Sequence, residues 1–185
     1  MHNQVHKSIG EKMDKTLSVL KEELQTIRAG RANPHILDKI VVEYYGSPTA
    51  LKQLANITVP EPRMLQINPY DVTSITDIEK AIMNSDLGMN PSNDGKIIRL
   101  SVPMLTEERR KDLVKQVKKT GENAKVAIRN ERREANDKLK KMNKDNDLTD
   151  DDLKSAEDKV QKMTDNHIKN IDEVVKSKEA EILEV

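Results

Sequence analysis

The feature that most constrains the fold is an apolar pattern that repeats every eleven residues between residues 106 and 145. Its six members lie alternately four and seven positions apart: Leu113, Val117, Ala124, Ile128, Ala135 and Leu139. Eleven residues make roughly three turns of a straight α-helix, so these side chains share one face without a left-handed supercoil. The segment therefore predicts one long helix that packs this face against other helices.

A second face of the same predicted helix is cationic. On a helical wheel, a set of basic residues gathers away from the apolar face, interrupted by Glu122 and Asn136: Lys111, Lys115, Lys118, Lys125, Arg129, Arg132, Arg133 and Lys140. At 1.5 Å per residue this set spans roughly 40 Å, which suits a large polyanion better than a small ligand. A charge run is more often a solvated helix face. The cluster of three arginines favours phosphate binding instead, because guanidinium groups bind phosphate in a bidentate way.

The charge distribution supports the same interpretation, although the formal net charge is zero. Residues 106–145 carry 14 Lys and Arg against 8 Asp and Glu, whereas residues 146–185 carry 6 against 12. Binding to nucleic acid depends on local potential, so a neutral total does not exclude it. Arg28 and Arg31 can extend the basic surface. No aromatic residue lies among these cations, so we expect contacts to phosphates rather than stacking on bases.

Composition excludes several functional classes. The chain has no cysteine, so disulfides, thiolate chemistry and cysteine zinc sites are absent. No apolar run approaches the ~20 residues of a membrane helix and no signal region is evident, so we expect a cytoplasmic protein. His2 and His6 are four residues apart but no third ligand accompanies them, so the four histidines are interpreted as structural or exposed rather than as metal ligands. The Asp145–Asp150 run is interpreted as a helix cap rather than a calcium loop, since Asp150 takes the required glycine position. We expect no enzyme, metal or cofactor.

Two further segments have helical periodicity. Apolar residues recur every three or four positions from Val5 to Ile27, and the predicted helix stops near Ala29 and Gly30. A third helix is predicted from the cap Thr149 to about residue 183. Because only a short turn separates it from the long central helix, the two must pack antiparallel. Together the three helices predict a bundle.

Residues 31–105 differ in kind, because all seven prolines fall there. The pattern predicts strands at 40–45, 57–59, 64–67 and 96–102, a helix at 76–85 and a turn at 90–95. The fold class is therefore α+β, with a bundle domain of residues 1–30 and 106–185 and a small β/α/β domain of residues 31–105 inserted in it. The two connections, 29–34 and 102–106, form a paired linker that permits hinge motion. The predicted hinge residues are Gly30, Arg31, Pro103, Leu105 and Thr106.

Glu131 interrupts this simple picture, because it lies beside the apolar face of the long helix. Two interpretations fit the sequence. The favoured one is a flanking side chain that extends its carboxylate into water. The other is a carboxylate that orients Arg132 or a neighbouring helix.

The chain resembles the bacterial ribosome recycling factors over essentially its whole length. The segments that carry the resemblance are Ile27–Ala32 (IRAGRA), Val42–Gly46 (VEYYG), Glu79–Ile82 (EKAI), Ser85–Gly88 (SDLG), Leu105–Lys111 (LTEERRK), Ala127–Asn130 (AIRN) with Arg132 and Arg133, and Gln161–Asp165 (QKMTD). Any one of these segments is weak evidence, but their order and spacing together are specific. The chain departs from the family pattern at Glu131, where many members have an apolar residue, and at Glu134, which replaces a common aspartate.

The resemblance implies a function as well as a fold. It implies an L-shaped, monomeric protein that binds rRNA of the large ribosomal subunit after termination and, with elongation factor G and GTP, splits the ribosome for reuse. It also implies that Arg129, Arg132 and Arg133 contact rRNA. The charge pattern adds Lys118, Lys125, Arg28 and Arg31 as further candidates. A structural helical clamp that binds other proteins is the alternative. That function would need an exposed apolar groove.

Overall fold

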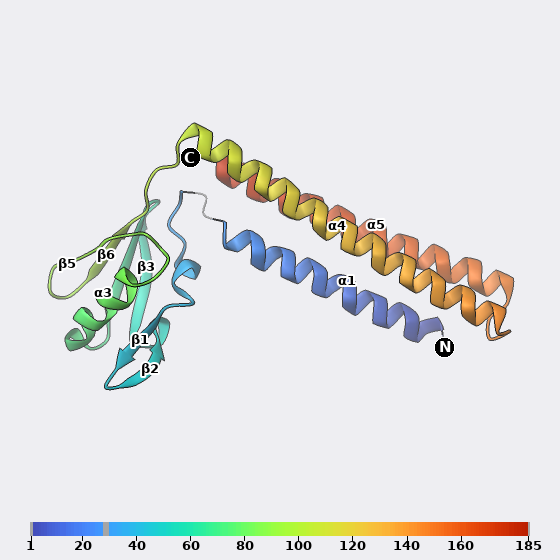
Figure 1. The fold of residues 1–185 in the computed structure, drawn as a ribbon, viewed down its shortest axis with the longest axis horizontal. Helices are drawn as coiled ribbons and strands as arrows, with labels where there is room; N and C mark the ends of the chain where they lie inside the picture. The colour runs from blue at the N-terminus through green and yellow to red at the C-terminus, as the bar shows by residue number, and fades with distance from the viewer. Residues whose placement is uncertain (1, 28–29, 185) are drawn as a thin grey trace. The chain divides into compact units, whose positions relative to one another are not determined.

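The computed structural model describes residues 2–27 and 30–184, which form two compact units. Among these, the first unit combines residues 2–27 with residues 108–184, and the second contains residues 30–107. Figure 1 shows long helices in the first unit and a small sheet with short helices in the second. The α+β class and the helical bundle are therefore confirmed. The domain boundaries at residues 30 and 106 stay predictions about where the chain divides into separately moving parts.

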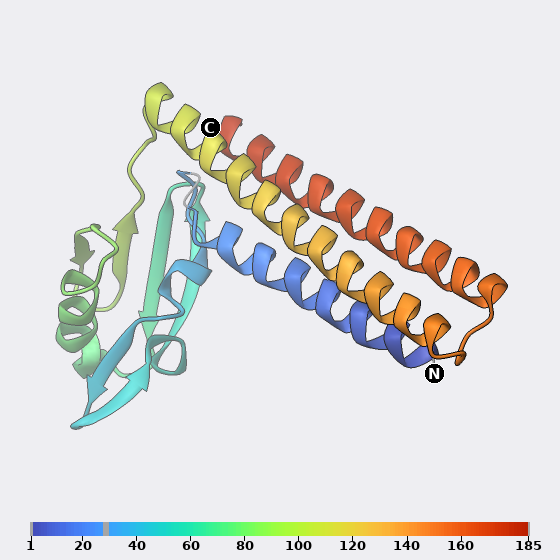
Figure 2. The ribbon, with the colours of Figure 1, turned by 45° about the vertical axis from the view of Figure 1, so that its right-hand side comes forward.

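The first unit is a bundle of α1 (His2–Gln25), α4 (Glu107–Lys144) and α5 (Asp150–Leu183). These helices run side by side in both ribbon views (Figures 1 and 2). All six members of the eleven-residue pattern are buried, together with Gly121, whose lack of a side chain hid it from the pattern. The periodicity of one helix thus correctly identified the face that forms the core.

The turn between α4 and α5 is built by caps. Thr149 is extended (φ −73°, ψ 164°), and its hydroxyl accepts a hydrogen bond from the Asp152 backbone N–H at 3.1 Å. The Asn143 side chain donates to the Leu148 carbonyl and to the Asp150 carboxylate, both at 3.0 Å. Because acids in the first turn of a helix favour its positive end, the Asp145–Asp150 run is explained by capping, as predicted.

The first helix ends earlier than the sequence predicts. Its last residue is Gln25 rather than one near Ala29, and Thr26 and Ile27 continue as a turn whose N–H groups bond the carbonyls of Glu23 and Leu24 at 3.2 Å. Ile27 is nevertheless buried. Bonds from N–H groups to carbonyls three residues earlier commonly tighten the last turn of a helix, and this explains why the apolar period outlasts the helix itself.

The second unit contains a four-stranded antiparallel sheet in the order β3 (Ala55–Glu61), β4 (Met64–Pro69), β6 (Ile98–Ser101), β5 (Pro91–Asn93). A separate hairpin pairs β1 (Val41–Tyr44) with β2 (Ser47–Ala50). Short helices complete the unit: η1 (Pro34–Leu37), α2 (Leu51–Leu54), η2 (Val72–Ser74) and α3 (Ile75–Met83). One core of aliphatic side chains from these elements holds the unit together.

Five elements of this unit were missed. The sequence predicts that Gly46–Pro48 ends a strand and that residues 90–95 are a turn, yet β2 and β5 occur there, and the short helices α2, η1 and η2 were not predicted. Pro48 and Pro91 explain the strand errors, because proline normally argues against a strand. It is tolerated on an edge strand or at a strand's first residue, and both strands lie at sheet edges. In the part of the chain that the structure describes, no helix is long and apolar enough to cross a membrane.

Candidate nucleic-acid interface

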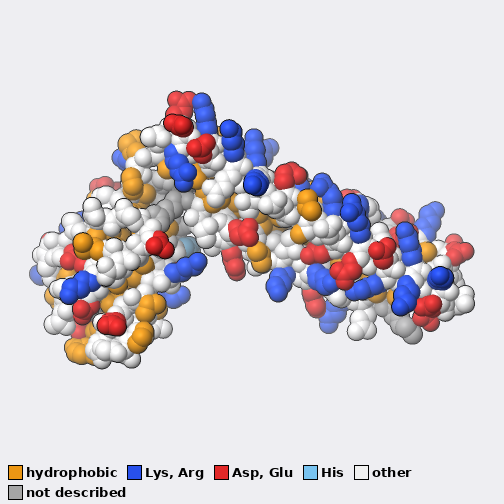
Figure 3. Space-filling view, in the orientation of Figure 1, with side chains coloured by type: hydrophobic (Ala, Val, Ile, Leu, Met, Phe, Trp, Pro, Cys, Tyr) orange, Lys and Arg blue, Asp and Glu red, His pale blue; other side chains and the backbone are white. Residues whose placement is uncertain are grey.

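The arginines and lysines predicted to bind rRNA lie on α4, with two exceptions in the connecting segment. Lys118 and Arg133 are exposed, and Arg129 and Arg132 are partly buried. Lysine and arginine side chains recur along the whole length of the helical unit in Figure 3, interspersed with acidic side chains. Arg31 is exposed in the second unit, and Arg28 lies outside the described residues. The structure thus leaves Lys118, Arg133 and Arg31 exposed where a polyanion can reach them.

Arg132 is oriented by the neighbouring helix. Its Nη1 donates to the Gln161 side-chain oxygen on α5 at 3.2 Å, and the Gln161 amide donates in turn to Asp165 at 2.8 Å. A guanidinium has several N–H donors in a planar fork, so one neutral partner orients it and leaves donors for phosphate. Sequence reasoning gave Gln161 no role. Its spacing of four residues from Asp165 on one helix was the available signal.

Lys125 has a different environment from the other predicted cations. It forms ion pairs with Asp172 of α5 and with Glu122, the latter at 3.4 Å, and only 17% of its side chain is exposed. The hydrogen bond that its ammonium group donates to the Asp172 carboxylate is the main cause of its raised pKa. Lys125 therefore joins α4 to α5, and its charge is compensated within the protein. Of the cations predicted on α4 to bind rRNA, it is the least suited to contact phosphate directly.

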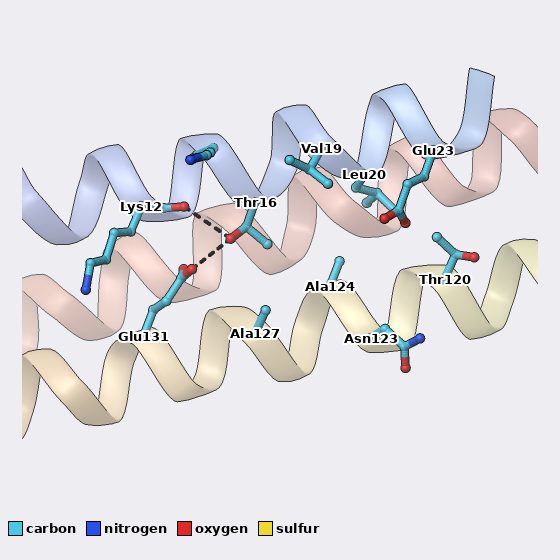
Figure 4. A pocket seen from close by; sticks show the side chains of 11 residues that line it. Lys12, Thr16, Val19, Leu20, Glu23, Thr120, Asn123, Ala124, Ala127 and Glu131 are labelled. Atoms are coloured by element: carbon cyan, nitrogen blue, oxygen red, sulfur yellow. Dashed lines mark hydrogen bonds between the residues drawn. The ribbon is translucent and has the colours of Figure 1, made fainter. Parts of the chain in front are cut away.

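The favoured interpretation of Glu131, a flanking side chain that extends its carboxylate into water, was wrong. Its Oε1 accepts a hydrogen bond from the Thr16 hydroxyl at 2.7 Å and thereby links α4 to α1 (Figure 4). The other oxygen, Oε2, is buried and has no hydrogen-bond partner among the described residues. The carboxylate contacts a neighbouring helix, which the other interpretation allowed.

Glu134 also faces α1. Its carboxylate accepts hydrogen bonds from Lys12 at 2.8 and 3.0 Å and from Lys138 at 2.9 Å. These bonds, chiefly the one from Lys12, lower the pKa of Glu134 to about 2. Glu131 and Glu134 thus form hydrogen bonds to side chains of α1, whereas Arg132 forms one to a side chain of α5. The two acids that depart from the family pattern do not pair with Arg132, and its charge stays available.

The two connecting segments lie against the same hairpin of the second unit. The Ala32 N–H donates to the Pro62 carbonyl, and the Val102 N–H donates to the Arg63 carbonyl, each at 2.7 Å. Gly30 is buried at φ +77°, and a Cβ built there would lie 3.1 Å from the Leu105 side chain. Two of the predicted hinge residues are therefore in close contact. The others, Arg31, Pro103 and Thr106, are exposed.

Comparisons with known proteins agree with one another. The family profile described as Ribosome recycling factor matches residues 20–183. The chain is 63% identical over 185 residues to the ribosome-recycling factor of Alkaliphilus oremlandii, and 59% identical over 185 residues to that of Clostridioides difficile. Each alignment covers 100% of both chains.

Two solved structures are similar over the full length. A solution structure of the ribosome recycling factor matches with a TM-score of 0.82 and 37% identity, covering 100% of this chain and 98% of that chain. The second is described as models for the T. thermophilus ribosome recycling factor and the E. coli elongation factor G bound to the E. coli post-termination complex. It matches with a TM-score of 0.68 and 46% identity, covering 99% of both chains.

Proposed function

This chain belongs to the ribosome recycling factor family, and we propose that it acts with elongation factor G and GTP to split the ribosome after termination. Full-length identity of about 60% to curated recycling factors carries this proposal. The similar structure placed with elongation factor G on a post-termination complex supports the same partners. The chain itself performs no chemical step in this function, because GTP hydrolysis belongs to the elongation factor.

The outer face of α4 is the proposed contact to rRNA. Arg129, Arg132, Arg133 and Lys118 bind phosphates of the large subunit, and Arg28 and Arg31 are further candidate phosphate ligands. Lys125 contributes mainly by holding α4 on α5. The observation that supports this assignment most directly is the orientation of Arg132 by Gln161, because an oriented guanidinium loses less freedom on binding phosphate.

The two connecting segments form the proposed hinge. The bonds at Ala32 and Val102 fasten each segment to the small unit, which supports a hinge outside these two points. The proposed bending residues are Gly30, Arg31, Pro103, Leu105 and Thr106. In the proposal, α4 anchors the bundle on rRNA while the small unit is the lever that the elongation factor moves.

Light scattering tests the function directly. Post-termination bacterial ribosomes are mixed with this chain, elongation factor G and GTP, and scattering falls when ribosomes separate into subunits. We expect a fall that requires all three components. Unchanged scattering, despite confirmed binding of the chain to the large subunit, would contradict the recycling function.

The electrostatic anchor has its own test. If about four phosphates are contacted, raising salt from roughly 50 to 200 mM weakens ribosome binding about a hundredfold at the slope found for duplexes. Co-sedimentation at several salt concentrations measures this slope. Binding that does not change with salt would refute the electrostatic anchor on α4. It would not refute the recycling function, which the light-scattering assay tests separately.

One observation supports the clamp alternative. A hollow of about 370 Å³ lies between α1 and α4, with Val19, Leu20, Ala124 and Ala127 among its lining residues (Figure 4). Its lining also includes Lys12, Lys15 and Glu23, so only part of the hollow is apolar. Ala127→Met fills this hollow with a neutral side chain that favours helix. Splitting at the wild-type rate by this variant is the expected result, whereas loss of activity with intact rRNA binding would favour the clamp.

A further inference from the structure

Two of the three aromatic residues of this protein are exposed at its surface. The chain has three tyrosines and no Phe or Trp. Tyr45 is 83% exposed and Tyr70 is 72% exposed, while the core of the second unit is aliphatic. Large aromatic side chains normally dominate cores and interfaces because they bury so much apolar area. Core packing therefore does not account for Tyr45, and an interface is the other common role of such a side chain.

The backbone at Tyr45 is also unusual. Tyr44 pairs with Ser47, so Tyr45 and Gly46 form a two-residue turn between β1 and β2. Both have positive φ, +49° at Tyr45 and +77° at Gly46. A two-residue turn of this kind favours Asn, Asp or Gly at its first position, and a side chain as large as tyrosine is disfavoured there. The turn alone therefore does not explain why this position holds a tyrosine.

The neighbouring residues hold the exposed ring in place. The rings of Tyr44 and Tyr45 meet edge to face with centroids 4.6 Å apart. The Tyr44 hydroxyl donates to the Asp71 carboxylate at 3.0 Å, and Asp71 is itself fixed by hydrogen bonds from the Thr73 backbone and hydroxyl. The Tyr45 ring is thus presented on an ordered support, which lowers the entropy lost when a partner binds.

An acidic hollow lies beside this ring. Its volume is about 560 Å³, and its lining includes Tyr45 together with the exposed carboxylates of Glu43 and Asp77. Among the described residues that line it there is no lysine or arginine. Hydrophobic and acidic side chains gather at the end of the small unit where the β1–β2 hairpin lies (Figure 3). The surface therefore combines an aromatic face with uncompensated negative charge.

We propose that Tyr45, Glu43 and Asp77 form a docking site for an arginine side chain on a basic loop of a protein partner. A guanidinium stacks on an aromatic face and bonds carboxylates in the same plane, so one side chain satisfies both features. An RNA partner is disfavoured at this surface, because both carboxylates repel phosphate. The site lies on the second unit and is independent of the cationic face of α4.

Tyrosine ring resonances test the docking site. The full chain, carrying ¹³C-labelled tyrosine, is titrated with the capped peptide Gly-Arg-Gly-Arg-Gly and with the same peptide containing neutral citrulline in place of arginine. The arginine peptide is expected to shift the rings of Tyr44 and Tyr45 and to leave that of Tyr70 unchanged. Equal shifts with the citrulline peptide, or shifts with an oligouridylate instead, would overturn the proposal.

Matched variants separate binding from folding. Tyr45→Asn suits the turn, so we expect an unchanged or higher Tm and at least tenfold weaker peptide binding, while Tyr70→Asn serves as the control with binding intact. The double variant Glu43→Gln with Asp77→Asn keeps both rings and is expected to bind at least threefold more weakly. Unchanged affinity in both site variants overturns the proposal. If Tyr45→Asn lowers Tm, the tyrosine stabilises the hairpin, and weaker peptide binding by that variant is then not informative. In that case the peptide affinity of the Glu43→Gln, Asp77→Asn variant alone tests the proposal.

Discussion

Gly121 offers a substitution whose sign depends on the tertiary structure. It lies in the interior of α4, where alanine normally stabilises a helix by about 1 kcal/mol relative to glycine. A Cβ at this position would lie 2.5 Å from Val175 Cγ2 on α5. Carbon atoms in contact prefer roughly 3.5–4 Å, so the helices or the valine must move by about 1 Å.

Val175 cannot easily make that movement. A valine in a helix has one strongly preferred rotamer, so its methyl group has little freedom to turn away. Overpacking of this kind costs about 1–3 kcal/mol, which exceeds the helix gain in most of its range. We therefore expect Gly121→Ala to lower the unfolding free energy by roughly 1 kcal/mol and Tm by about 3 °C.

Gly10→Ala is the matched control. Gly10 also lies inside a helix, but its added Cβ would meet Met163 Cε at 3.1 Å, the end of a flexible side chain that can shift. This substitution is expected to raise stability by about 0.5–1 kcal/mol. Thermal and urea unfolding followed by circular dichroism compare the two variants.

A double variant isolates the contact itself. Combining Gly121→Ala with Val175→Ala removes the methyl groups that would clash, so the two substitutions should show a favourable coupling of about 1–3 kcal/mol. If Gly121→Ala alone stabilises the protein as much as Gly10→Ala does, the close approach of α4 to α5 is absent in solution. The reasoning would then be refuted.

Three further outcomes follow from the site and the connections. Arg132→Ala should weaken ribosome binding by about 1–3 kcal/mol with helicity unchanged; a collapse of the circular dichroism signal would show a structural role instead. The lowered pKa of Glu134 adds stability that is fully present above its unfolded value of 4.5 and is lost as pH falls toward about 2. Because 44% of that side chain is exposed, we expect the free energy of unfolding to fall by less than ~1 kcal/mol across this pH range when it is measured by urea unfolding. Glu134→Gln should remove this pH-dependent contribution. Gly30→Ala should lower Tm, since alanine at φ +77° costs about 1 kcal/mol, and an unchanged Tm would contradict the observed backbone.

The candidate site was only partly readable from the sequence. The spacing of basic residues on one helix placed Arg132 and Arg133 on a common surface, because side-chain direction on a helix follows from position alone. The same reasoning grouped Lys125 with them. It could not show that Asp172, on another helix, compensates that lysine. The role of Glu131 was misjudged for the same reason, since its partner Thr16 is 115 residues away in the chain.

The small unit shows a similar division. Strands with uninterrupted apolar and β-branched runs were predicted, because burial on a sheet leaves that pattern. The strands that begin with or contain Pro91 and Pro48 were missed, because an edge strand is defined by the neighbour it lacks. The positive φ at Tyr45 was equally invisible, since it depends on the pairing that closes the hairpin around it.

Sequence alone established the apolar face of the long helix α4, the start of α5 and the family to which the chain is similar. These properties depend on local periodicity, on capping and on ordered motifs, all of which are written along one segment. Only the tertiary structure decided which partner each charged side chain meets, how closely Gly121 approaches α5, and which carboxylates stay uncompensated. Those properties depend on groups brought together from distant parts of the chain, and no local pattern records which groups will meet.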